Sequence, residues 1–261
     1  MSDALDRLIA VLEKIGDVGI ALSGGVDSMT LAHVAHARST STAEMFHAVS
    51  PAVPEHATAR VRDHAERHGW VLHVVGAGEF EDPDYLKNPV NRCYFCKTNL
   101  YGRLRAATDA VICSGTNTDD LGDFRPGLAA ADEKSVRHPF VEAGIDKAGI
   151  RAIADGFGLD DIAELPAQPC LASRVETGLP ILADQLTLID RIERQVADQI
   201  GPGDIRARMT RDGIRLEVPQ AQLGAASSLK ATLTRLITEE GHRFAGISAY
   251  RRGSAFLRDT A

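Results

Sequence analysis

The sequence is short of aromatic residues, positive charge and long hydrophobic runs. Aromatic residues make up 5% of the 261 residues, with a single tryptophan, whereas 44% are hydrophobic and 25% are charged. This composition is typical of a folded globular protein and excludes a disordered or fibrous chain. No stretch approaches the roughly 18 consecutive apolar residues of a membrane span. Internal repeats and low-complexity segments are also missing, which argues against a repeat architecture.

Positive charge is in the minority, with Lys+Arg 29 against Asp+Glu 36 and a formal net charge of −7. This balance argues against broad electrostatic capture of nucleic acid or an anionic membrane, and leaves room for a local basic patch. The first residues lack the basic start and continuous apolar run of a secretory signal, and their apolar positions have helical spacing. We therefore expect a cytoplasmic protein with no membrane partner.

Cysteine is scarce, and a chain of this length can build a core without disulfides. Of the four cysteines, Cys93 and Cys96 form a C-x-x-C, and Cys170 lies in a segment broken by prolines. Cys113 ends an apolar run and is predicted to be a small buried core residue. For the other three, which we expect in loops, the pattern favours metal or sulfur chemistry.

Short apolar runs alternate with helical patterns along the first part of the chain. The runs expected to be buried strands are 18–22, 45–49, 71–75 and 110–114. Such alternation predicts a parallel sheet covered by helices, with ligands bound beyond the carboxyl ends of the strands. The segment 115–140 is rich in Gly, Asp and Pro and is expected to be mostly loop.

The last part of the chain has a different pattern. A helix is expected over 183–200, paired strands over 205–209 and 214–218, then helices to about 240 and a strand near 244–250. We therefore predict an α/β protein, with a Rossmann-like parallel-sheet domain over residues 1–182 and a smaller α+β domain over residues 183–261.

A candidate phosphate-binding loop joins the first predicted strand to a helix. Its sequence is Ser23-Gly24-Gly25-Val26-Asp27-Ser28. Backbone N–H groups and the positive helix end converge on an anion at such a junction, the glycines allow close approach, and the serines add hydroxyl donors. Asp27 is a candidate ligand of Mg²⁺. The simpler alternative is a turn that caps the helix.

Polar side chains follow the fourth predicted strand, at the same sheet edge as this loop. They are Asn117, Asp119, Asp120, Asp123 and Arg125. One or more of them is expected to contact adenine, ribose or magnesium, and the alternative is a solvated turn.

The three cysteines outside the core allow several kinds of chemistry. Cys93, Cys96 and Cys170 are candidate ligands of an iron–sulfur cluster with one open iron, ligands of a zinc site, or an independent nucleophile with a redox pair. A structural zinc needs a fourth ligand, for which His138 is the candidate. We favour the cluster, which can carry an extra sulfide as nucleophile. Arg174, near Cys170, is a candidate to stabilise charge on a reaction intermediate, or else forms a surface ion pair.

Arginines recur in the C-terminal part. Arg206 and Arg208 are two apart on one predicted strand and so share a face, with Glu217 on the partner strand. A cross-strand ion pair on an exposed sheet is one interpretation. A wider basic surface would include Arg211, Arg215, Arg251 and Arg252.

The S-G-G-x-D-S string at 23–28, between strand and helix, resembles the PP-loop ATP pyrophosphatase superfamily, whose domain is similar to the adenine nucleotide alpha hydrolases. The resemblance implies that ATP-Mg²⁺ binds there, that it is cleaved between the α- and β-phosphates, and that a substrate oxygen is adenylated. An incoming nitrogen or sulfur nucleophile then displaces AMP.

Longer strings resemble the LarE family of ATP-dependent sulfur transferases over nearly the whole chain. They are Asn88–Lys97, Ser114–Gly127, Asp146–Arg151 and Pro169–Arg174. The resemblance implies adenylation of pyridinium-3,5-biscarboxylic acid mononucleotide and sulfur insertion to give a thiocarboxylate, in making the nickel-pincer cofactor of lactate racemase. It also implies a homo-oligomer, and a substrate-phosphate site at Arg206, Arg208 and Glu217.

Members of this family supply sulfur in two ways. Some sacrifice a cysteine, at the position that matches Cys170, and need no metal cofactor. Others resemble tRNA thiolases and hold a [4Fe-4S] cluster on three cysteines. Since this chain also has Cys93 and Cys96, we expect the cluster. The rival functions are a tRNA thiolase, for which the basic surface is the best argument, and an amide-forming synthetase of the same superfamily.

Overall fold

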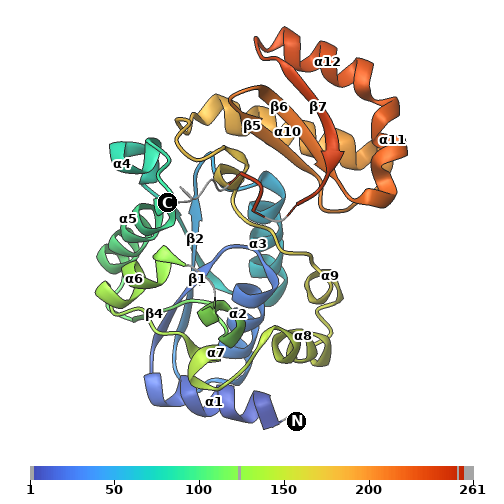
Figure 1. The fold of residues 1–261 in the computed structure, drawn as a ribbon. Helices are drawn as coiled ribbons and strands as arrows, with labels where there is room; N and C mark the ends of the chain where they lie inside the picture. The colour runs from blue at the N-terminus through green and yellow to red at the C-terminus, as the bar shows by residue number, and fades with distance from the viewer. Residues whose placement is uncertain (1–2, 123–124, 252, 256–261) are drawn as a thin grey trace. The chain divides into compact units, whose positions relative to one another are not determined.

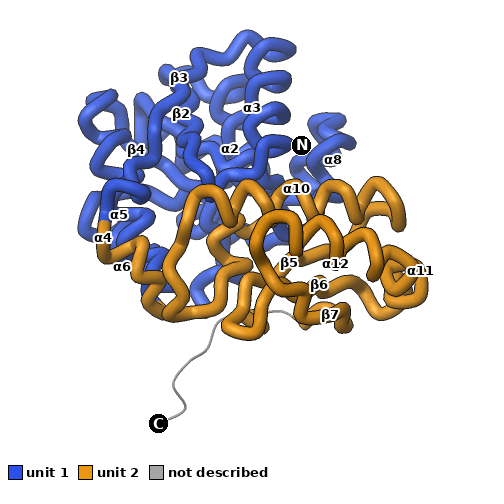
Figure 2. Tube along the Cα trace, turned by 90° about the horizontal axis from the view of Figure 1, so that it is seen from above, with its two compact units in different colours: residues 1–82, 91–168 blue, residues 83–90, 169–261 orange. Residues whose placement is uncertain are grey.

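The computed structural model describes residues 3–122, 125–251 and 253–255 (Figure 1). Asp123 and Arg252, both named above, lie outside these residues. The chain divides into two compact units, one made of residues 1–82 and 91–168 and the other of residues 83–90 and 169–261 (Figure 2). Within the described ranges, no helix is both long enough and apolar enough to cross a membrane.

Unit 1 is built on a four-stranded parallel sheet. Its strands are β1 (Val18–Leu22), β2 (Ala43–Val49), β3 (Val71–Gly76) and β4 (Val111–Cys113). They lie in the order β3-β2-β1-β4, so β2 and β3 are added on one side of β1 and β4 on the other, with all strands parallel. This arrangement confirms the predicted α/β class, and it brings the segments after β1 and β4 to one edge.

Helices cover both faces of this sheet (Figure 1). The longer ones are α1 (Asp3–Ile15), α2 (Val26–Arg38), α3 (Glu55–His68), α5 (Arg92–Ala107), α6 (Pro126–Glu133) and α8 (Lys147–Gly156). Short helices are α7 (Pro139–Glu142) and α9 (Asp160–Ala163), and η1 (Glu79–Glu81) and η2 (Thr118–Gly122) are 3-10 turns.

The two faces of the sheet carry separate apolar clusters. Alternate residues of a strand point to opposite faces, and Ile20 and Met45 pack with the buried side chains of α1, α2, α3 and α8. Phe46 and Ile112 pack instead with Tyr101 and other residues of α5 and α6. Cys113 is fully buried in the first cluster, as predicted, and burial raises the pKa of its thiol to about 12.

Unit 2 is an α+β unit with a three-stranded mixed sheet. Its strands are β5 (Arg206–Thr210), β6 (Gly213–Val218) and β7 (Phe244–Ala249), of which β5 and β6 are antiparallel and β6 and β7 parallel. Its helices are α4 (Pro83–Leu86), α10 (Ala183–Ile200), α11 (Leu223–Ser228) and α12 (Lys230–Glu239), with 3-10 turns η3 (Leu171–Arg174) and η4 (Gln220–Gln222).

The division between units differs from the predicted boundary after residue 182. The chain enters unit 2 at Pro169, and residues 83–90 join it from the middle of unit 1. Backbone hydrogen bonds explain this, because Ile181 N donates to Leu86 O and Gly178 N donates to Asn88 O. Such pairing between distant segments has no signal in local composition.

The segment around the C-x-x-C is helical, and the expectation that Cys93 and Cys96 lie in a loop is wrong. Both belong to the first turns of α5. Few side chains of this helix, among them Tyr101 and Leu104, are buried. Contacts with the sheet thus support a helix whose sequence has little amphipathic pattern.

Ile20 tests the buried face of the central strand. Replacing this fully buried residue by alanine leaves a cavity, so we expect Ile20→Ala to lower the free energy of unfolding by about 2–5 kcal/mol. The matched control is Val71→Ala on the edge strand, where the side chain is 53% exposed and a change within about 0.5 kcal/mol is expected. Urea unfolding measures both, and equal losses would contradict this account of the core.

Candidate nucleotide and sulfur site

The loop between β1 and α2 is closed by its two serines. Ser28 Oγ accepts a hydrogen bond from Ser23 N at 3.1 Å and donates to Gly25 O at 3.2 Å, and the two serine hydroxyls are 3.1 Å apart. Gly25 occupies the N-cap position, and no side chain caps α2. The first N–H groups of a 13-residue helix therefore lack a capping side chain, which is the arrangement that binds anions.

Two glycines allow this loop to lie against its neighbours. Gly24 has a φ of +79°, and a Cβ there would lie 2.8 Å from Ala57 O at the start of α3. Gly115, after β4, approaches the start of α2 so closely that a Cβ would lie 2.7 Å from Ser28 N. The loops after β1 and β4 are thus in direct contact, as the sheet order requires.

Asp27, the predicted magnesium ligand, forms an ion pair with Lys147 at the start of α8. Lys147 Nζ lies 2.7 and 2.8 Å from the two carboxylate oxygens. Burial raises the pKa of Asp27 and Lys147 opposes this, while Asp120 adds a smaller raising effect. Lys147 was missed as a site residue, although it lies in the string 146–151 and directly follows the N-cap Asp146.

The residues after β4 lie beside this pair. Asp119 accepts a hydrogen bond from Lys147 N at 3.0 Å, and the buried Asn117 side chain accepts from Asp119 N at 3.0 Å. Asp120 pairs with Arg125 at 2.6 Å. Unit 1 therefore brings the predicted residues Ser23, Gly24, Gly25, Asp27, Ser28, Asn117 and Asp119 to one edge of the sheet.

Arg60 is a further residue that sequence analysis did not find. From α3, its Nη1 donates to Gly24 O at 2.7 Å and to Gln168 Oε1 at 3.1 Å. Burial lowers the pKa of its guanidinium, but an arginine stays charged under such a shift. Arg60 places a positive charge beside the loop, and nothing in the helical pattern of 55–68 distinguishes it from a surface arginine.

His47 ties the end of β1 to α3. Its Nδ1 lies 3.0 Å from Leu22 O and its Nε2 lies 2.9 Å from Thr58 Oγ1. The carbonyl can only accept, so Nδ1 carries the proton and Nε2 accepts from the threonine. Burial lowers the pKa of this histidine, which is fully enclosed.

Cys93 and Cys96 lie one turn apart at the start of α5, both half-buried. Residues three apart share a helix face, and the positive end of a helix favours thiolate. His138, the candidate fourth zinc ligand, instead places Nδ1 2.8 Å from Ser114 Oγ. The cysteine pair belongs to unit 1 and Cys170 to unit 2, so their sharing one metal group stays a prediction.

The Cys170 segment is held in shape by Arg174. Cys170 is exposed and precedes the 3-10 turn η3. Arg174 donates from Nη1 to the carbonyl oxygens of Pro169 and Cys170, while Nε and Nη2 lie 2.9 and 2.8 Å from the two carboxylate oxygens of Glu193. Arg174 thus forms an ion pair, but the pair does not lie at the surface as expected, because the Arg174 side chain is only 5% exposed.

The predicted phosphate residues of unit 2 are also buried. Arg208 Nε pairs with Glu217 Oε2 at 3.0 Å, and Arg208 Nη1 donates to Ser173 O at 3.0 Å. Arg206 pairs with Asp204 at 3.0 Å. The cross-strand pair therefore exists but is enclosed, unlike the exposed pair considered above, and it joins β5 and β6 to the Cys170 segment.

Three known proteins are similar to the chain. It is 36% identical over 227 residues to the uncharacterized protein slr1717 of Synechocystis, covering 85% of this chain and 84% of the relative. It is 30% identical over 193 residues to the uncharacterized protein MJ0830 of Methanocaldococcus jannaschii, covering 72% of each. It is 26% identical over 260 residues to the pyridinium-3,5-bisthiocarboxylic acid mononucleotide synthase of Lactiplantibacillus plantarum, covering 97% of this chain and 93% of the synthase. The chain belongs to this LarE-like family.

For this LarE-like protein, no protein-family model gives a match. The family relationship therefore rests on whole-chain similarity, which extends across both units.

His47 predicts an acid sensitivity. Its pKa is lowered in the folded state, so the unfolded chain, with an ordinary histidine pKa near 6.5, takes up the proton first. We expect the free energy of unfolding to fall as pH drops below about 6.5, and to fall less steeply in His47→Gln, by at most about 1.4 kcal/mol per pH unit. Urea unfolding at several values between about pH 7 and pH 5, where histidine titrates, measures the free energy of unfolding of both proteins. Equal slopes against pH in wild type and His47→Gln would contradict the assignment.

Proposed function

We propose that this LarE-like protein is an ATP-dependent sulfur transferase. In the proposed reaction it adenylates a carboxylate of pyridinium-3,5-biscarboxylic acid mononucleotide, releases pyrophosphate, and replaces AMP by sulfur to give a thiocarboxylate. The observation that carries the proposal is the uncapped start of α2 beside the Asp27–Lys147 pair. Similarity to the synthase, whose name states a bisthiocarboxylic acid product, supports this choice of substrate.

In the adenylation step, a substrate carboxylate oxygen forms a bond to the α-phosphorus of ATP. The bond from that phosphorus to the bridging oxygen breaks, and pyrophosphate leaves with the negative charge. The N–H groups of the first turn of α2 and the cations of Lys147 and Arg60 are aimed at this edge. They stabilise the charge that develops on the departing phosphates, so no strong base is needed.

The same edge fits a magnesium ion. Asp27 and Asp120 supply carboxylate oxygens, the donors that Mg²⁺ prefers, and the two carboxylates interact electrostatically. Lys147 neutralises Asp27 in the structure. Asp27 would hold the ion, which would neutralise phosphate charge, and Lys147 would then turn its ammonium to a phosphate oxygen.

Sulfur chemistry is assigned to Cys93, Cys96 and Cys170. The thiols of Cys93 and Cys96 lie on one face of α5, and soft thiolate donors fit an iron–sulfur cluster. A [4Fe-4S] cluster on the three cysteines would hold a sulfide for transfer, and an external sulfur donor would have to replace that sulfide after each turnover, so that the protein itself is not consumed. Arg174 positions the Cys170 segment through its backbone carbonyls.

The substrate phosphate is assigned to unit 2. A cavity of ≈ 510 Å³ opens beside the buried ion pair, and its lining includes Arg215, Glu217, Ser248, Arg251 and Ser254. Arg208 lies behind the lining and pairs with Glu217. Among the described residues that line this cavity, Arg215 and Arg251 are the cations. We propose that these arginines bind the nucleotide phosphate, that Arg206 and Arg208 support the site from within, and that the enzyme works as a homo-oligomer.

Lys147 tests the adenylation site. Lys147→Ala removes the cation assigned to the leaving phosphates, so we expect pyrophosphate release with ATP, Mg²⁺ and the mononucleotide to slow by about 10²-fold or more, with Asp27→Ala at least as severe. Lys134→Ala is the matched control and should leave the rate unchanged, because this lysine ends α6 and its carbonyl oxygen accepts hydrogen bonds from Arg105 in the last turn of α5. Normal pyrophosphate release by Lys147→Ala and Asp27→Ala would show that the site is elsewhere.

Metal analysis tests the sulfur step. Protein purified without oxygen should contain about four irons and four acid-labile sulfides per chain, with the absorption of a cluster. Cys93→Ala/Cys96→Ala should lose both while releasing pyrophosphate at the wild-type rate, because adenylation precedes sulfur transfer. Stoichiometric zinc without iron would overturn the cluster in favour of a structural site, and absence of metal would overturn it in favour of sacrificial Cys170.

A further inference from the structure

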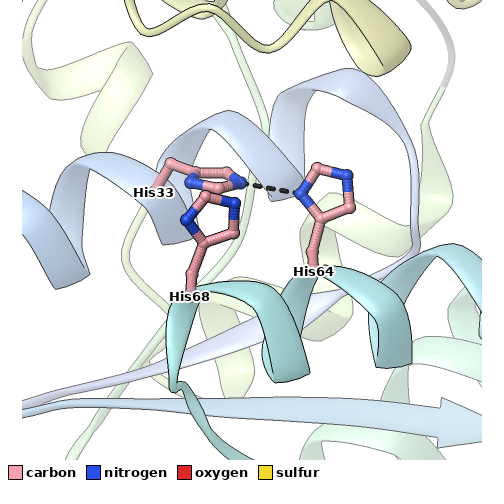
Figure 3. A group of neighbouring side chains, drawn as sticks. All are labelled: His33, His64 and His68. Carbon is pink, nitrogen blue, oxygen red and sulfur yellow. Dashed lines mark hydrogen bonds between the residues drawn. The ribbon is translucent and has the colours of Figure 1, made fainter.

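Three histidines meet on the side of unit 1 formed by α2 and α3. His33 comes from the middle of α2, and His64 and His68 come from the last turns of α3 (Figure 3). His33 Nε2 lies 2.9 Å from His64 Nδ1, and the ring centroids of His33 and His68 are 4.5 Å apart. One nitrogen from each of the three rings lies within 4.8 Å of the other two. His33 and His64 are buried, whereas His68 is exposed and leaves the group open on one side.

The group has no part in the function proposed above. The nucleotide loop contacts the start of α2 and Ala57 at the start of α3, whereas His33 lies about two helical turns further along α2. The mechanism uses none of the three imidazoles.

His64 is oriented as a metal ligand would be. Its Nε2 lies 2.8 Å from Asp161 Oδ2. The carboxylate accepts this hydrogen bond, so Nε2 carries a proton. In a neutral imidazole, the form that binds a metal, Nδ1 then has the lone pair, and this nitrogen faces His33. Carboxylates hold metal-binding histidines in this way, and they fix the tautomer and increase the basicity of the ligand nitrogen.

His33 is in the uncharged form that metals require. Burial lowers its pKa to about 3, with smaller contributions from His68 and His64. When both imidazoles are uncharged and His64 carries its proton on Nε2, His33 Nε2 is the donor to His64 Nδ1. A metal ion between these atoms would replace that hydrogen bond, and His33 would then carry its proton on Nδ1. Zinc–nitrogen bonds are about 2.0–2.1 Å long. The two ring nitrogens would therefore have to move apart by a few tenths of an ångström.

A neighbouring set of side chains is a poorer candidate. Asp63, His64 and Asp161 also lie close together, but Arg67 forms ion pairs with both carboxylates. Its guanidinium takes the position of a cation there. The three imidazoles, by contrast, form a nitrogen-only set of the type that binds zinc and related ions with a fourth position open to water.

We propose that His33, His64 and His68 bind a divalent transition-metal ion, with Co²⁺ as the probe and zinc as its competitor, and that Asp161 is the positioning residue of the site. The ion would join the end of α3 to the middle of α2, outside the nucleotide and cysteine chemistry.

Trp70 makes the proposal directly measurable. It is the single tryptophan of the chain, it is 6% exposed, and its ring centroid lies 4.7 Å from that of His33. A paramagnetic ion such as Co²⁺ bound to His33 should therefore quench the intrinsic tryptophan fluorescence, and zinc should compete and restore it.

The experiment is a Co²⁺ titration of tag-free, full-length protein, followed by fluorescence and by visible absorption. We expect the quenching to saturate at about one Co²⁺ per chain. The visible spectrum should show cobalt d–d bands without thiolate charge-transfer bands. His68→Gln changes an exposed residue and should weaken binding more than about 10-fold, and Asp161→Asn about 10- to 100-fold. His56→Gln, an exposed histidine of the same helix, is the matched control and should bind as wild type does.

Several results would overturn the site. They are the absence of quenching, quenching that zinc does not reverse, or equal affinity in wild type, His68→Gln and Asp161→Asn. Circular dichroism of each variant separates loss of binding from loss of fold. A cobalt spectrum with thiolate bands that persists in His68→Gln would assign the metal to the cysteines instead.

Discussion

The uncapped first turn of α2 is the constraint on which the arrangement of unit 1 depends. With Gly25 at the N-cap and no capping side chain, the helix presents unsatisfied N–H groups and the positive end of its dipole at the carboxyl edge of the sheet. Ser28 folds back to Ser23 and shapes the loop around this end. Gly24 and Gly115 leave space for the neighbouring backbone, so the loops after β1 and β4 meet there.

Electrostatics at this edge are balanced without a ligand. Burial disfavours the charge on Asp27, and Lys147 offsets part of that cost through two short contacts. In the function proposed above, this pair would exchange partners, with the Asp27 carboxylate turning to the metal ion and the Lys147 ammonium to a phosphate. Mutual neutralisation therefore holds the two side chains in place, and the proposed nucleotide site would be pre-organised.

In unit 2, one arginine has a comparable role. Arg174 binds Glu193 through two parallel contacts and at the same time donates to the carbonyls around Cys170. The ion pair and the hydrogen bonds offset the cost of removing the guanidinium from water. Removal of Arg174 or of Glu193 would leave the other charge buried without its partner. The exposed cysteine is thus presented by a segment whose shape is maintained from within, through Glu193, Arg208 and Glu217.

The sequence by itself determined the elements whose signals are local. The apolar run 18–22, the helical spacing after it and the glycines of the loop specify strand, turn and helix through steric and hydrophobic preferences of neighbouring residues. The same holds for α10 and for the strands β5 to β7. Only the tertiary structure decided which distant residues meet: Lys147 with Asp27, Arg174 with Glu193, His33 with His64, and residues 83–90 with unit 2. These pairings depend on the order of the strands and the packing of the helices. The residues next to a polar side chain in the sequence do not determine which distant side chain it will meet, so local preferences cannot specify the partner.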